Sequence, residues 1–582
     1  MSVIKFLCVR GLAFRGKDEL VGSPHNGNYL GLLELISQHD PFLAEHIRLY
    51  ANKGRGHASY LSSTICEEII ELMGQKVLSV IFCEMKSAKY FSISVDSTPD
   101  ITHVDQLTVT CRYVQHSGPI ERFLKFIPMY SHTGSGIAEI ILKFFEENGI
   151  DIKNCRGQSY DNASNMSGKY NGVQSIIREK CSAAHYVPCT AHSLNLVGKN
   201  AAECCTAVVD FFDLIQSLYS WFVASTHRWN VHKTHLGGLP VSKALSDTRW
   251  SARHDAVHAL NKGYDQTISA LEELASDDNQ PPDSRCEAEG FSKKLKQLET
   301  AILLQVWGTL LERFQKTSLS LQSSQISLNT AIELLNSLSD YIKSQRDEFD
   351  KYEQMAIKMS GFKDYKEATK RRRTKKFQFD DDASTHTTLS PRDHFRSQVF
   401  VNIIDLLCSA LKTRIEAYQH VHSLFGFLND LCGLDSDNIL RAATNLVKAY
   451  PNDFEESLGP ELIQFAKLFK MSDTSNHVSN QKVGDSVEVR MLRLLNDFSC
   501  THTFPNVHIA LRIYLCMMTS NCSGERSFSK LKRIKNELRS TMRQERLTYI
   551  SLMSIEHELL SSLSFQELME DFARRKIRKR PM

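Results

Sequence analysis

Three acidic residues stand where the sequence pattern predicts that an element begins or ends: Asp96, Asp161 and Glu525. Asp96 and Asp161 each end a short predicted strand, and Glu525 falls in the first turn of a basic, amphipathic helix. Clustered carboxylates could hold two divalent ions around a phosphodiester and activate a water or a hydroxyl. Each acid alone has a simpler explanation, because Asp is common in turns and a Glu complements the positive end of a helix dipole.

The elements that must position the first two acids follow a recognisable order. In "YFSISVDSTPD" apolar residues alternate with Ser92, Ser94 and Asp96, and "LTVTCRY" and "IERFLKFIPM" predict a second and a third strand. A helix, "SGIAEIILKFFEENG", comes next, followed by two short strand candidates, "NCRGQSYD" and "HYVPC". Three antiparallel strands, a helix and a further strand is the order of the RNase H-like fold, whose metal-binding carboxylates end the first strand and follow the fourth. Asp96 and Asp161 occupy these two positions.

Bulk properties describe a globular chain. Its 582 residues carry 70 Lys and Arg against 67 Asp and Glu, a net charge of +3, so nucleic-acid binding must come from local clusters. The 15 Cys have no regular spacing, which favours a reducing compartment over a disulfide framework. The first residues do not read as a signal peptide, and no apolar run is long enough to span a membrane. We therefore expect a soluble, intracellular protein that makes no membrane contact.

Five motifs carry a family resemblance. They are "SISVDSTPD", "GQSYDNASNMSG", "CTAHSLNL", "SDTRWSAR" and "GERSFSKLKRIKNELRSTMRQERLTYISLMSI". In this order they resemble the hAT superfamily of DNA transposases, in the domesticated or transposon-derived branch close to zinc-finger MYM-type proteins. The resemblance covers almost the whole chain, and the last motif is the most specific. It implies an RNase H-like core split by a large helical insertion, with Asp96, Asp161 and Glu525 as the catalytic, metal-binding acids.

The resemblance and the helical periodicity together give a domain layout. We expect an α/β protein with a helical N-terminal segment over residues 1–88 and the first part of the RNase H-like core over 89–254. An all-α insertion is expected over 255–500, and residues 501–582 should complete the core and form the hAT C-terminal dimerisation region. Hard oxygen ligands suit Mg²⁺ or Mn²⁺.

Two further groups gain a role from the resemblance. Cys189 and His192 have metal-ligand spacing, but no second pair completes a structural zinc site, so we expect them to support the active centre; a buried helix start is the simpler explanation. Trp250 matches a family Trp that stacks on a flipped DNA base. A Trp is more often a core residue, yet the polar neighbours Arg249 and Ser251 favour the DNA-binding interpretation.

Two basic clusters, "KRRRTKK" and "RRKIRKR", occupy residues 370–376 and 574–580. Arg371, Arg372 and Arg373 of the first are candidates for DNA phosphate contacts, and at least one cluster is interpreted as a nuclear localisation signal. A solvated loop is the alternative for both.

The apolar positions Leu547, Ile550 and Met553 continue a stripe beyond the last motif, and the resemblance implies that they form a homodimer or larger oligomer. Packing within the same chain is the alternative. Nothing before residue 28 resembles the zinc-bearing DNA-recognition module of the family. Two functions therefore stay open: a transposase that cuts and joins DNA, and a domesticated, non-mobile nuclear factor that uses the same fold for dimerisation and interaction.

Overall fold

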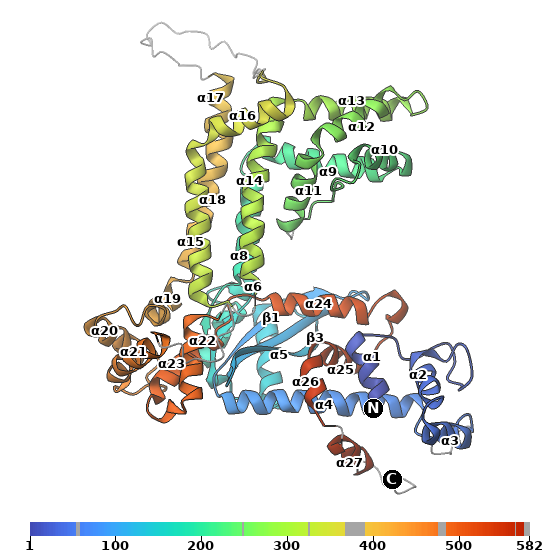
Figure 1. Cartoon of the computed structure of the whole chain (residues 1–582), viewed down its shortest axis with the longest axis vertical. Helices are drawn as coiled ribbons and strands as arrows, with labels where there is room; N and C mark the ends of the chain where they lie inside the picture. Colours follow the sequence, from blue (N-terminus) through green and yellow to red (C-terminus); the bar gives the residue numbers. More distant parts are fainter. Residues whose placement is uncertain are drawn as a thin grey trace. The chain divides into compact units, whose positions relative to one another are not determined.

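The computed structural model describes residues 1–53, 59–246, 250–323, 326–366, 390–474, 485–564 and 566–574 (Figure 1). The chain forms two compact units. Unit 1 contains Met1–Cys189, Ser323–Asn329 and His420–Met582, and unit 2 contains Thr190–Gln322 and Thr330–Gln419. The helical unit thus begins near residue 190 and ends near 419, whereas we expected an insertion over 255–500. The described residues of 190–254 form helices that pack on other helices of unit 2, and those of 420–500 form helices that pack on or beside the sheet of unit 1.

Unit 1 is built on a five-stranded sheet with the order β3-β2-β1-β4-β5. The strands are β1 (Phe91–Pro99), β2 (Asp105–Gln115), β3 (Gly118–Met129), β4 (Cys155–Ser159) and β5 (His185–Tyr186). The first three pair antiparallel, and β4 and β5 run parallel to β1. These strands and the helix α5 (Gly134–Glu147) confirm the order of elements predicted from the sequence. The predicted ends differ: β1 continues past Asp96 to Pro99, and β4 ends at Ser159, two residues before Asp161.

Both faces of β1 are covered. The apolar side chains of Phe91, Ile93 and Val95 are buried in the hydrophobic core that α4 (Ser63–Ala88) and α5 share, and the Phe91 ring lies 5.7 Å from that of Phe145. On the other face Ser92 and Ser94 are also fully buried. The helices α23 (Pro505–Cys516) and α24 (Cys522–Ile534) lie over that face and supply hydrogen-bond partners to its polar side chains. Alternation in sequence here marks a polar but buried face and not a solvent-exposed one.

The ends of the chain meet in unit 1. The N-terminal segment forms α1 (Ser2–Arg10), α2 (Gly27–Ser37), α3 (Pro41–Tyr50) and α4. The C-terminal helices are α25 (Gln544–Ile555), α26 (His557–Ser562) and α27 (Gln566–Arg574), and α25 packs on α4, α1 and β3. Gly74 permits the close approach of α4 to α25, because a Cβ there would lie 2.3 Å from the Tyr549 ring.

Further helices complete unit 1. They are α6 (Ser164–Ser167), α7 (Val173–Lys180), α19 (Gln419–Phe425), α20 (Ser436–Ala449), α21 (Leu458–Thr474) and α22 (Val487–Asp497). Helices α20 and α21 pack together, and α21 and α22 pack on α23, which lies on the sheet.

Unit 2 is helical over its described residues. Its helices are α8 (Thr190–Ala202), α9 (Thr206–Val223), α10 (Thr226–Leu236), α11 (Trp250–Lys262), α12 (Tyr264–Ser276), α13 (Pro282–Leu295), α14 (Leu298–Leu321), α15 (Leu328–Ser344), α16 (Phe349–Ser360), α17 (Pro391–Phe395) and α18 (Val401–Glu416). The core lies around α14, which packs on α8, α9, α11 and α16. All four Trp of the chain lie in this unit.

No single helix among the described residues is long and apolar enough to cross a membrane. The pair α9 and α10 meets the length and composition criteria only when taken together, with a bend of 112° between the two helices.

Candidate functional site

The start of α24 is tied to β1 by the fully buried Asn521. Its Oδ1 lies 2.5 Å from Ser94 Oγ, and its Nδ2 donates to the Val95 carbonyl at 3.2 Å. Ser94 Oγ also lies 2.7 Å from the carbonyl of Ser159, the residue that faces Ser94 across the parallel β1–β4 pair. One hydroxyl therefore joins the helix start and both strands.

Each of the three predicted acids lies one structural repeat beyond this junction. Asp96 is two residues after Ser94, and Asp161 is two residues after Ser159. Glu525 is one helical turn after Asn521, and its N–H donates to the Asn521 carbonyl at 3.1 Å. Asp96 therefore lies on the same face of β1 as Ser94, Glu525 lies one turn along α24 from Asn521, and Asp161 lies just beyond the end of β4. All three are half-buried.

Two of the acids accept a hydrogen bond from a nearby backbone N–H. Asp96 Oδ1 accepts the Ser97 N–H at 2.9 Å, and Asp161 Oδ1 accepts the Ala163 N–H at 3.2 Å. Within the described ranges, no three His, Cys, Asp or Glu side chains are arranged to hold one metal ion. The chemical type of the donors, three carboxylates, suits Mg²⁺ or Mn²⁺. The metal role of Asp96, Asp161 and Glu525 stays a prediction.

Cys189 joins the end of β4 to the start of α24. Its N–H donates to the Tyr160 carbonyl at 3.0 Å, next to Asp161, and its Sγ accepts the Asn521 N–H at 3.1 Å. The side chain is fully buried. Cys189 thus contacts Tyr160, the residue before Asp161, and Asn521, which lies one helical turn before Glu525. His192 lies in the first turn of α8, in unit 2.

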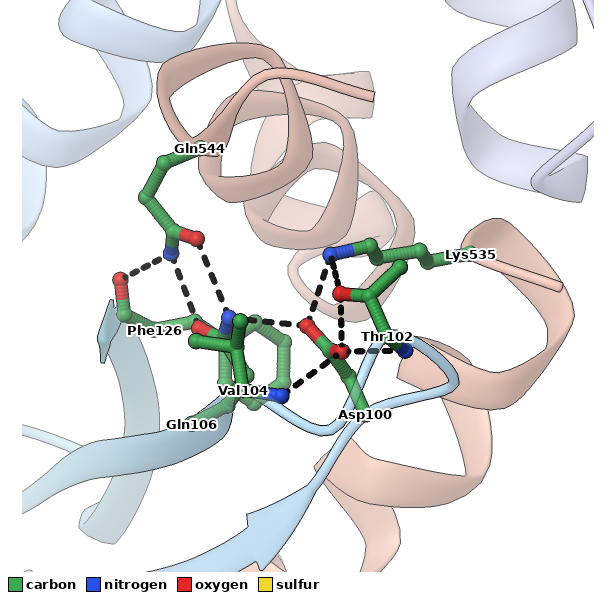
Figure 2. Close-up of polar contacts among 7 residues, drawn as sticks. All are labelled: Asp100, Thr102, Val104, Gln106, Phe126, Lys535 and Gln544. Carbon is green, nitrogen blue, oxygen red and sulfur yellow. Dashed lines mark hydrogen bonds and ion pairs between the residues drawn. The ribbon is translucent and has the colours of Figure 1, made fainter. Parts of the chain in front are cut away.

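The other end of α24 is fixed by a buried ion pair (Figure 2). The helix ends at Ile534, and the Lys535 side chain is buried. Lys535 Nζ lies 2.7 Å from Asp100 Oδ2 and 3.0 Å from Thr102 Oγ1, and Gln106 Nε2 donates to Asp100 Oδ2 at 3.0 Å. Burial alone would raise the pKa of Asp100, but the hydrogen bonds from Lys535, Thr102 and Gln106 outweigh it and hold that pKa at about 2.

Gln544, the first residue of α25, extends the same network. Its amide is bonded to the amide of Gln106 and donates to the Phe126 carbonyl at 3.0 Å (Figure 2). The β1–β2 turn therefore anchors both α24 and α25. We did not identify Asp100, Lys535 or Asn521 from the sequence; their one signal was that each falls within or beside a recognised motif.

The outer side of α24 is basic. Arg526, Lys532 and Arg533 are exposed, and they lie on the helix that begins with Glu525 in its first turn. A pocket of about 540 Å³ opens beside the far end of this helix, where Leu538 is 94% exposed.

Trp250 is a core residue of unit 2. It is 4% exposed, and its ring lies 5.8 Å from those of Trp307 and Phe314. A Cβ at Gly198 would lie 2.4 Å from the same ring. The interpretation of Trp250 as a base-stacking residue is therefore wrong for this structure. Its polar sequence neighbours were misleading, because α11 begins at Trp250 and directs the ring onto α14.

Leu547, Ile550 and Met553 are also core residues, with exposed fractions of 0%, 1% and 0%. They belong to α25, which packs on α1, α4 and β3 of the same chain. The alternative of packing within one chain is thus the correct one for these three side chains. Arg371, Arg372 and Arg373 lie outside the described residues, as does residue 575 onward in the second basic cluster.

Two family models match the chain. Residues 1–172 match the model described as "ZMYM1/FAM200, RNase-like domain", and residues 475–559 match the "hAT family C-terminal dimerisation region". The first match includes Asp96 and Asp161, and the second includes Glu525. These two matches confirm the resemblance to hAT-derived proteins.

Two relatives share the name "52 kDa repressor of the inhibitor of the protein kinase". The human protein is 24% identical over 230 residues, and the mouse protein is 23% identical over 233 residues. Each match covers 38% of this chain and 30% of the relative, so the chain matches less than a third of the length of these proteins.

Proposed function

We propose that unit 1 is an RNase H-like core of hAT origin that acts on DNA phosphodiesters through Asp96, Asp161 and Glu525. The observation that supports the proposal is the junction of Ser94, Ser159 and Asn521, because each of these residues lies two to four positions before one of the three acids. The strand order and the RNase-like family match support the same fold.

In this proposal the three carboxylates bind Mg²⁺ or Mn²⁺, which would activate the attacking oxygen and stabilise the departing one. Asn521, Ser94 and Cys189 position the acids, because they hold α24 against the ends of β1 and β4. Lys535 and Asp100 fix the far end of the same helix. A helix held at both ends keeps Glu525 in one place relative to Asp96.

The exposed Arg526, Lys532 and Arg533 would contact the DNA backbone beside the acids. Such contacts are independent of base sequence and weaken as salt rises. DNA as a partner and the nucleus as the location are parts of this proposal; the name of the human and mouse relatives, a repressor, is compatible with both.

The test uses a pre-nicked DNA duplex, Mn²⁺ and a high protein concentration, because the acids act on the backbone and not on bases. We expect weak nicking or strand transfer by the parent protein and none by Asp96→Asn or Asp161→Asn. Glu139→Gln, which removes an exposed carboxylate from α5, is the matched control and should keep the activity. Equal activity in all four proteins would contradict the proposal.

A second function is a domesticated factor that uses the same fold for self-association and partner binding without catalysis. The match of residues 475–559 to a dimerisation region favours it. Absence of nicking and strand transfer together with a stable dimer would support this second function. We propose that Leu538, the most exposed large apolar side chain in the matched region, contributes to the dimer contact in either case.

A further inference from the structure

Two adjacent cysteines, Cys204 and Cys205, lie in the turn between α8 and α9 of unit 2. Both side chains are partly exposed, and their sulfur atoms are 3.8 Å apart, with the Cys204 thiol as the donor to Cys205 Sγ. Nothing in the proposed reaction uses them. The other exposed cysteines, Cys83 and Cys286, have no such sulfur neighbour recorded within the described residues.

The position of Cys205 favours a thiolate. Cys205 is the N-cap residue of α9, an 18-residue helix, and the positive end of a helix dipole stabilises negative charge. The hydrogen bond from Cys204 lowers the pKa of the Cys205 thiol and raises that of Cys204. Cys205 is therefore the thiol suited to attack an oxidant, and Cys204 is placed to attack the oxidised Cys205 sulfur.

We propose that Cys204 and Cys205 form an oxidation site at which hydrogen peroxide or another hydroperoxide converts the adjacent thiols to a disulfide. The Cys205 thiolate attacks the peroxide, an S–O bond forms, the O–O bond breaks and hydroxide leaves. Cys204 then attacks the Cys205 sulfur and loses its proton, the S–S bond forms, the S–O bond breaks, and a second hydroxide leaves. In balance, two thiols and one hydrogen peroxide give one disulfide and two waters, and two electrons pass from sulfur to oxygen.

The resulting bridge would be easily reversed. The Cα atoms of adjacent residues are about 3.8 Å apart, less than the roughly 4.4–6.8 Å that an unstrained disulfide spans. A strained disulfide is reduced readily by thiols. The bridge would also change the α8–α9 turn, where the Cys204 carbonyl accepts a hydrogen bond from Asn402 Nδ2 of α18 at 3.4 Å.

The test treats the full chain with hydrogen peroxide, blocks the remaining thiols and measures peptides by mass spectrometry. We expect the peptide with Cys204 and Cys205 to lose the mass of two hydrogens, and Cys205 to react at least about tenfold faster than Cys83 or Cys286. Mild dithiothreitol should restore the original mass. If that peptide stays unchanged at peroxide concentrations that oxidise Cys83, the proposal is wrong.

Two serine variants separate the roles of the thiols. Cys204→Ser should form no disulfide and should accumulate a Cys205 sulfenic acid that dimedone traps. Cys205→Ser should leave Cys204 resistant to peroxide. Neither thiol is deeply buried, so both variants should keep the far-ultraviolet circular dichroism spectrum of the parent. Equal oxidation of the two single variants would overturn the assignment of Cys205 as the attacking group.

Discussion

Asn521 Oδ1 lies 2.5 Å from Ser94 Oγ, so the first turn of α24 is bonded to β1 two residues before Asp96. The two residues are 427 positions apart in the sequence. The contact lies within unit 1. It joins the first strand to a helix that follows unit 2 in the sequence.

The first prediction concerns this contact. Asn521→Ala should lower the free energy of unfolding by about 1–3 kcal/mol, because the buried Val95 carbonyl and the buried Ser94 hydroxyl lose the Asn521 side chain as a hydrogen-bond partner. Urea unfolding followed by circular dichroism measures the change. The exposed Asn438→Ala offers the same substitution without burial and should cost less than about 0.5 kcal/mol. Equal effects would mean that Asn521 does not hold α24.

The second prediction concerns metal binding. Asp96→Asn should abolish Mn²⁺ binding in calorimetry and change the melting temperature little, since removing one of several clustered carboxylates relieves repulsion. Glu139→Gln should bind Mn²⁺ like the parent. Binding of equal strength by Asp96→Asn would remove Asp96 from the site.

The third prediction is a pH dependence from Asp100. Its pKa is about 2 in the folded chain and near 3.8 in an unfolded one, so its charge stabilises the fold above pH 4, and this contribution is lost as the pH falls toward 2. A shift of this size corresponds to about 2 kcal/mol. Unfolding measured from pH 5 to pH 2 should show this loss in the parent and not in Asp100→Asn. Parallel curves for the two proteins would contradict the role of the Lys535–Asp100 pair.

The fourth prediction separates the core from the contact surface of the C-terminal region. Leu547→Glu with Ile550→Glu should unfold the chain, because both side chains are fully buried beside α4. Leu538→Glu should instead give a folded protein that sediments as a smaller species than the parent at micromolar concentration. A folded double variant would show that α25 does not belong to the core of its own chain.

The strands could be predicted from the sequence, because alternation with period two and the turn signal at Pro99 are local. The burial of both faces of β1 could not, since the covering residues of α23 and α24 lie more than 400 positions away. The same limit explains Trp250 and Leu547. The polar neighbours of Trp250 suggested a DNA contact and the apolar stripe of Leu547 suggested a dimer contact, whereas the partners that bury them, Trp307 and the helix α4, are remote in the sequence.

Charge pattern also misled at Lys535. It follows the basic residues of α24 in the sequence, but it is buried and paired with Asp100 in the β1–β2 turn, just after the helix ends at Ile534. Cys189 was expected to support the site, and the structure gives this expectation a specific contact, the Asn521 N–H.

The packing of Trp250 on Trp307 has a spectroscopic consequence. All four Trp lie in unit 2, so fluorescence excited selectively at the red edge of the indole absorption band reports on that unit alone. The emission should be shifted to the blue, since Trp250 and Trp307 are shielded from water. The unfolding of unit 2 can therefore be followed by its own fluorescence, without an added dye.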